Sequence, residues 1–177
     1  HFYTYDSAVG QNVYAKPATL RPFISAMQYM HYDADKGEYI NRSIIFKSWK
    51  DEAIDILGGT KCGKIPFKER ANLTPEQLEQ QRTIRCYKLV YGLLSFTKGK
   101  TSQGHDHNIE NIPVLYRVTG TAFSPVTSAL DLLKKRKKLM FNCTFSLDTK
   151  RQKKGGNVFY VPEISVNADA NLQLSDT

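Results

Sequence analysis

The stretch LLKKRKKLMFNCTFSLDTKRQKKGGNVFYVPEIS, residues 132–165, decides the expected fold. It leaves the basic end of an expected helix, passes through an alternating segment at 139–149 and returns in an aromatic segment at 158–166. Apolar and polar residues that alternate with a period of two are typical of half-buried strands, and Gly155-Gly156 marks a turn between them. The stretch therefore predicts a helix followed by an antiparallel hairpin with a strongly basic tip, KRQKKGGN.

The positive charge of the chain is concentrated in this same stretch. Residues 134–154 contain nine Lys and Arg against Asp148 alone, which leaves +8, the net charge of the whole chain. Like charges repel one another, so localised charge of this kind indicates a polyanionic partner. A solvated helix end, or a nuclear-localisation patch in a eukaryotic protein, would be the alternative explanation for KKRKK.

The segments before this stretch alternate between expected strands and expected helices. An irregular arm with one short strand is expected first, followed by a hairpin, two helices, two further strands and a third helix that Ser124 caps. The arm is expected at 1–22, with its strand at 12–16, and the hairpin pairs 23–33 with 38–49. The first two helices are expected at 51–57 and from Thr74, the two further strands at 87–96 and 112–123, and the third helix at 124–138.

This order predicts a mainly β protein of the OB-fold type. We expect a five-stranded barrel over 23–166 with a helix between strands 3 and 4 and a helical insertion at about 50–86, after strand 2. Residues 1–22 form the arm, and 167–177 begin a C-terminal tail. The loops that grip oligonucleotides in this fold would then be 33–38 and 150–157.

Three short motifs carry a family resemblance. Residues 113–120 read PVLYRVTG, 147–149 read LDT and 160–162 read YVP. The region 112–165 resembles phage-encoded single-stranded DNA-binding proteins. That resemblance implies an OB-fold and sequence-tolerant binding of single strands in phage DNA replication and recombination, in the cytoplasm of the infected cell. It also implies replication proteins, and in some relatives host RNA polymerase, as partners. An acidic C-terminal tail is common in the family, but this chain ends NLQLSDT, with Asp176 alone.

A single-strand binder needs cations for the phosphates and flat rings for the exposed bases. Candidate side chains lie in the two basic clusters and on strands where Lys or Arg accompanies an aromatic residue, although each aromatic residue could equally belong to the core. The expected contact residues are Lys135, Arg136, Lys150, Arg151, Lys153, Lys154, Tyr39, Arg42, Lys47, Trp49, Lys88, Tyr91, Tyr116, Arg117 and Tyr160.

No catalytic, metal or cofactor site is expected. Three cysteines without a CxxC pair indicate reduced thiols, and His105 and His107 lack the spaced partners that a zinc site requires. No run of about 18 apolar residues predicts a membrane span. Two other functions remain open: a transcription-regulating protein that contacts RNA polymerase or duplex DNA, and a metal-dependent nuclease. The nuclease would use carboxylates such as Asp51, Glu52, Asp55 and Glu69.

Overall fold

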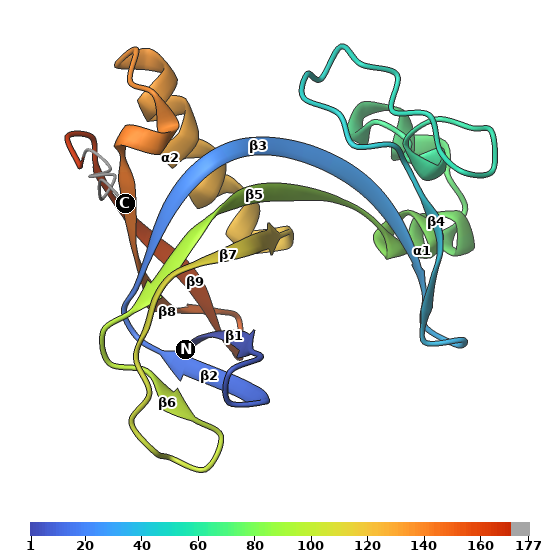
Figure 1. Cartoon of the computed structure of the whole chain (residues 1–177). Coiled ribbons are helices and arrows are strands. Elements are labelled where there is room, and N and C mark those ends of the chain that lie inside the picture. Colours follow the sequence, from blue (N-terminus) through green and yellow to red (C-terminus); the bar gives the residue numbers. More distant parts are fainter. Residues whose placement is uncertain (171–177) are drawn as a thin grey trace. The chain divides into compact units, whose positions relative to one another are not determined.

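Strands make up 49% of the chain and helical segments 22%, so the expected mainly β class is confirmed. The structure is a computed structural model, and it describes residues 1–170. Its strands are β1 (Phe2–Asp6), β2 (Gln11–Ala15), β3 (Ala18–Asp33), β4 (Glu38–Arg42), β5 (Ile84–Phe96), β6 (Lys100–Thr101), β7 (Ile109–Val118), β8 (Thr144–Lys154) and β9 (Asn157–Asn167). The α-helices are α1 (Pro75–Thr83) and α2 (Phe123–Lys135), and short 3-10 segments lie at Lys61–Gly63, Phe67–Asn72, Gly120–Ala122 and Met140–Asn142 (Figure 1).

The strands form two antiparallel sheets. The larger sheet has the order β7-β5-β3-β8-β9, and β4 pairs with β3 beside this path. The smaller sheet has the order β1-β2-β6. Within residues 1–170 the larger sheet is not closed into a barrel, because β7 and β9 are its two ends. Pro162 lies in β9, which agrees with the edge position that a proline in a strand requires.

The chain divides into two compact units. Unit 1 comprises His1–Ile24, Val90–Tyr116 and residues from Thr121 onward, and unit 2 comprises Ser25–Leu89 with Arg117–Gly120. Fully buried side chains of unit 1 include Leu20, Phe96, Leu130, Phe145 and Leu147. Those of unit 2 include Met27, Ile84 and Leu89. Each unit therefore has its own apolar core.

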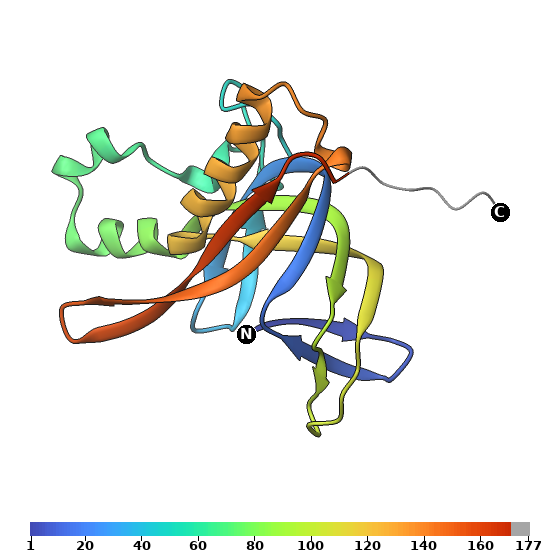
Figure 2. The ribbon, with the colours of Figure 1, turned by 90° about the vertical axis from the view of Figure 1, so that its left-hand side faces the viewer.

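The helix α2 follows the pattern that its sequence predicts, except at its start. The stripe Val126, Ala129, Leu130 and Leu133 is buried. The helix begins at Phe123, after a 3-10 turn, so the expected capping role of Ser124 is wrong. Figures 1 and 2 both show α2 running beside β9. The helix thus buries its apolar face within unit 1.

The helix α1 confirms the strongest capping signal in the sequence. The Thr74 hydroxyl accepts a hydrogen bond from the backbone N–H of Gln77, whose side chain accepts one from the N–H of Thr74. Pro75 occupies the first turn. This capping box satisfies backbone donors that a helix N-terminus otherwise leaves unpaired.

The expectation of an irregular N-terminal arm is wrong. Residues 1–22 form the hairpin β1–β2 and the start of β3, and β2 also pairs with β6. Side chains in β1 alternate between half-buried and exposed, which is the strand period, but both sets contain aromatic residues. Hydrophobicity alone therefore could not reveal the alternation. The short strand expected at 12–16 corresponds to β2.

The expected helix at 51–57 is also wrong. Isolated antiparallel β-bridges join Ser43 to Asp55 and Ile54 to Thr60, so this segment consists of extended chain and tight turns. The Asp55 carboxylate accepts backbone N–H groups from Leu57 at 3.1 Å, Gly59 at 3.1 Å and Cys62 at 3.0 Å. A side chain that gathers backbone donors in this way competes with a helix.

No helix in the described part of the chain is long and apolar enough to cross a membrane.

Candidate nucleic-acid interface

The β8–β9 hairpin presents cations and an aromatic ring on one surface. Arg151 pairs with Tyr160 and Lys153 pairs with Val158 across the ladder. Residues directly opposite each other on neighbouring strands project to the same face, so these four share one face. Tyr160 is 62% exposed. The hairpin is a long two-stranded ribbon in Figure 2.

The charges of this hairpin are not neutralised locally. Lys150, Arg151, Lys153 and Lys154 are all exposed, and none of them forms an ion pair with another residue of the 1–170 region. Asp148, the one acid in the basic stretch, pairs instead with Lys16 at 3.2 Å. We call residues 150–160 the basic hairpin. Its cations are therefore available to an external anion.

The second expected cluster, at the end of α2, is partly compensated. Lys134 pairs with Asp131 at 3.7 Å, and Lys138 pairs with Asp169 at 2.7 Å. Lys135 and Arg136 are exposed. Cations in the last turn also interact favourably with the helix dipole, so part of this charge has a purely structural explanation.

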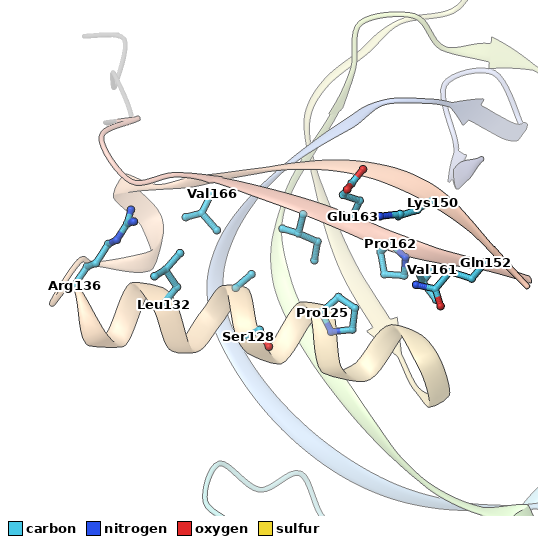
Figure 3. Close-up of a pocket in the computed structure, with 12 residues that line it drawn as sticks. Pro125, Ser128, Leu132, Arg136, Lys150, Gln152, Val161, Pro162, Glu163 and Val166 are labelled. Carbon is cyan, nitrogen blue, oxygen red and sulfur yellow. The ribbon is translucent and has the colours of Figure 1, made fainter. Parts of the chain in front are cut away.

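A groove of about 470 Å³ lies between α2 and the β8–β9 strands (Figure 3). Arg136, directly after the end of α2, and Lys150 of β8 lie toward its opposite ends, so the groove brings the two predicted clusters onto one surface. Its lining residues are Pro125, Ser128, Ala129, Leu132, Arg136, Lys150, Gln152, Val161, Pro162, Glu163, Ile164 and Val166. None of them is aromatic. The groove therefore offers charge at its ends but no ring on which a base could stack.

Unit 2 contains a separate aromatic pocket of about 390 Å³. The rings of Tyr32 and Tyr39 meet edge to face at 5.2 Å between centroids, and those of Tyr39 and Tyr87 at 6.4 Å. Arg82 and Arg85 also line the pocket. Tyr39 was an expected contact residue, whereas Tyr32, Tyr87, Arg82 and Arg85 were not. The pairing of β3 with β4 could have indicated Tyr32, because the two strands form the expected hairpin.

The phenols of this pocket are linked to each other. The hydroxyl oxygens of Tyr39 and Tyr87 lie 3.0 Å apart. Burial, and then the hydrogen bond to Tyr39, raise the pKa of Tyr87 to about 12, although the charges of Arg85 and Arg117 oppose the shift. The Tyr87 hydroxyl therefore keeps its proton at neutral pH and can donate a hydrogen bond. Arg117, another expected contact residue, is exposed.

The remaining expected residues of unit 2 differ in exposure. Arg42, Lys47 and Trp49 are exposed, and the Trp49 ring lies edge to face against Phe46 with centroids 6.1 Å apart. Lys88 is buried, so the expectation that this strand cation faces solvent or a ligand is wrong. Lys88 lies in β5, which runs between β3 and β7 inside the larger sheet and not at its edge.

Two expected aromatic residues of unit 1 are half-buried. Tyr91 lies in β5 and Tyr116 in β7. Burial raises the pKa of Tyr116 to about 12. Their rings contribute to the packing of the sheet, which leaves Tyr160 as the exposed ring among the aromatic residues expected in unit 1.

The carboxylates of the nuclease hypothesis do not share a helix face. Asp51 accepts the backbone N–H groups of Lys47 and Ser48, and Asp55 is buried and holds the turn described above. Within residues 1–170 no group of three His, Cys, Asp or Glu side chains could hold a metal ion. Burial raises the pKa of the Cys62 and Cys86 thiols to about 11, which keeps both in the less nucleophilic protonated form.

Comparison with protein-family models, with curated proteins and with solved structures finds no match for this chain.

Proposed function

We propose that this chain binds single-stranded DNA without sequence specificity and without catalysis, through the basic hairpin. One observation carries the proposal: the exposed Tyr160 shares one face of the hairpin with two uncompensated cations, Arg151 directly opposite it and Lys153. Lys150 and Lys154 add charge at alternate positions of the same strand. The cations would hold phosphates and the ring would stack a base, and this combination binds single strands with little dependence on sequence. A role in phage DNA replication or recombination, in the host cytoplasm, follows from the resemblance to phage proteins and is part of the same proposal.

The order of the strands supports an OB-type arrangement. In an OB-fold the first strand pairs with both the second and the fourth, and a helix connects the third to the fourth. The order β7-β5-β3-β8-β9, with α2 between β7 and β8, has these connections if β3, β5, β7, β8 and β9 are strands one to five. The basic hairpin is then the connection between strands four and five, which contacts oligonucleotides in OB-folds.

This assignment changes the role of the region after β3. The strand β4 pairs beside the sheet path and is not the second OB strand. Most of unit 2 is then one long insertion between strands one and two, the other connection that contacts oligonucleotides in this fold. Of the pocket's tyrosines, Tyr39 belongs to that insertion, and Tyr32 and Tyr87 lie on the ends of strands one and two that border it. We propose it as a second contact for bases, with Arg85 for a phosphate.

The proposal is tested by fluorescence anisotropy with labelled 20-nucleotide probes of oligo(dT), oligo(rU) and a duplex, with and without Mg²⁺. We expect tight binding to oligo(dT), weaker binding to the duplex and a steep loss of affinity with added salt. Equal affinity for the duplex would contradict the proposal and favour a duplex-binding transcription regulator. Cleavage of the probe in Mg²⁺ would favour the nuclease.

A further inference from the structure

The small sheet β1-β2-β6 presents three exposed tyrosines on one face. Tyr3 is 67% exposed, Tyr5 63% and Tyr14 37%. Tyr3 pairs with Tyr14, and Tyr5 lies two residues along β1, so the three side chains project to the same side. We call these residues the tyrosine face. Exposed large rings gathered in this way are typical of a binding surface.

The two central rings are already arranged side by side. The centroids of Tyr3 and Tyr14 lie 5.8 Å apart and their planes are inclined by 34°. Tyr3 and Tyr5 are separated by two strand residues, about 6.8 Å along β1. Neighbouring bases of an extended single strand can be spaced over a comparable distance, so each ring could stack one base.

Lysines border the tyrosine face. Lys100 of β6 pairs with Tyr14 and therefore projects to the same side. Lys16, Lys98 and Lys100 line a hollow of about 480 Å³ with Tyr14. Lys16 and Lys100 pair with Asp148 and Asp106, both at 3.2 Å, but these pairs are exposed and phosphate can exchange with the carboxylates at little cost.

The acid within β1 does not oppose this charge. Asp6 directly follows Tyr5 in β1, so its side chain projects to the opposite side of the sheet, where it pairs with His107 at 2.9 Å. The tyrosine face thus combines rings and cations, and this chemistry suits an unpaired polynucleotide more than an acidic or purely apolar partner.

The tyrosine face is also connected to the basic hairpin. Lys16 contacts the side chain of Asp148 at 3.2 Å and donates a hydrogen bond to the Thr149 carbonyl oxygen at 3.3 Å. Thr149 directly precedes Lys150, and Arg151 follows. Within unit 1, Lys16 therefore lies between the cations of the basic hairpin and the rings of Tyr14 and Tyr3.

We infer that the tyrosine face is a further base-stacking surface, which extends the path of a single DNA strand beyond the basic hairpin. This inference rests on the proposed function. It adds a site that neither the charge pattern nor the family resemblance indicated, and it predicts that binding depends on the length of the strand.

The test compares oligo(dT) probes of six and 20 nucleotides on three proteins: the unaltered chain, Tyr3→Ala/Tyr5→Ala/Tyr14→Ala, and the matched control Tyr3→Phe/Tyr5→Phe/Tyr14→Phe. The alanine variant should bind the long probe at least tenfold more weakly and the short probe within about twofold of the unaltered chain. The phenylalanine control should retain its affinity for both probes, because it keeps the rings.

If the alanine variant binds the long probe as tightly as the unaltered chain does, the inference is overturned and the proposed function stays intact. The tyrosine face would then suit a protein partner. Failure of the unaltered chain to bind either probe would overturn the proposed function itself. Photocrosslinking of the unaltered chain to oligo(dT) that contains 5-iododeoxyuridine provides a readout that needs no variant. Crosslinks at Tyr3 or Tyr14 support the inference, and crosslinks confined to the basic hairpin and unit 2 overturn it.

Discussion

Arg151 and Tyr160 lie directly opposite each other on the β8–β9 ladder, so a guanidinium and an exposed phenol ring share one face of the hairpin. A nucleotide needs a cation for its phosphate and a flat surface for its base, and this pair supplies both within one cross-strand step. The chemistry of the proposed interface is thus concentrated in two residues that are nine positions apart in the sequence.

The ring of Tyr160 should contribute directly to strand binding. Tyr160→Ala should weaken binding of oligo(dT) by about 1–3 kcal/mol, roughly five- to a hundredfold, because it removes a stacking surface. Tyr160→Phe is the matched control and should bind like the unaltered chain. Anisotropy titrations at one fixed salt concentration measure the difference. Equal loss in both variants would show that the hydroxyl, not the ring, matters.

The cations beside Tyr160 should determine the salt dependence. Arg151→Glu/Lys153→Glu should weaken binding strongly and reduce the slope of log affinity against log salt by about 1.4, since each phosphate contact on a single strand contributes roughly 0.7. Lys50→Glu/Lys68→Glu changes the net charge equally on exposed residues elsewhere and is the control. A similar loss in both variants would indicate a general charge effect and remove the hairpin from the site.

Gly92 should tolerate no side chain. A Cβ at this position of β5 would lie 2.1 Å from the backbone oxygen of Arg21, so the two strands would have to separate. Gly92→Ala should lower the free energy of unfolding by about 3 kcal/mol. Gly156→Ala, at the hairpin turn where a Cβ meets nothing within 4 Å, should change it by less than about 0.5 kcal/mol. Urea denaturation followed by circular dichroism compares the two.

Asp55 should stabilise unit 2 only above acidic pH. Burial raises the pKa of this carboxyl, but hydrogen bonds from Asn41 and from the backbone of Gly59, Leu57 and Cys62 outweigh that effect and hold the pKa below 3.8. An acid with a lowered pKa in the folded state contributes stability above its ordinary pKa and loses it as the pH falls through the folded value.

Asp55→Asn should therefore lower the free energy of unfolding by roughly 2–3 kcal/mol at pH 7. The variant should also lose less of its stability than the unaltered chain when the pH falls below about 4. Urea titrations at pH 7 and pH 3 measure both effects. Asp35→Asn, an exposed carboxylate in the β3–β4 turn, is the control. Identical acid dependence in Asp55→Asn and the unaltered chain would contradict the assigned role.

Lys64 should change the stability in the same direction as Asp55, but in the alkaline range. Burial, and then the charges of Arg70 and Arg85, lower its pKa to about 8, while its amino group donates to the carbonyl oxygens of Gln81 and Ile84. The unfolded chain binds more protons than the folded chain between pH 8 and the ordinary value of 10.5, so the contribution of Lys64 rises with pH in this range. The stability of the unaltered chain relative to Lys64→Met should increase from pH 7.5 to pH 9. A difference that stays constant would contradict the shift.

The sequence by itself determined the elements whose signals are local. The α1 capping box needs only Thr74, Pro75 and Gln77, and the stripe of α2 needs only four apolar residues at helical spacing. The β8–β9 hairpin needs alternating side chains and a glycine turn, and its charge can be counted directly. Each of these signals depends on residues within a few positions of one another.

Only the tertiary structure decided which exposed side chains meet. Tyr14 pairs with Lys100, which is far away in the sequence, and Tyr39 meets Tyr87 across the fold of unit 2. Lys88 looked like a surface cation, yet the folded chain buries it. Strand pairing joins distant segments, and a one-residue shift in register would move every side chain to the other face. For this reason the basic hairpin could be predicted from its own residues, whereas the tyrosine face and the pocket around Tyr39 emerged only from the pairing of the strands.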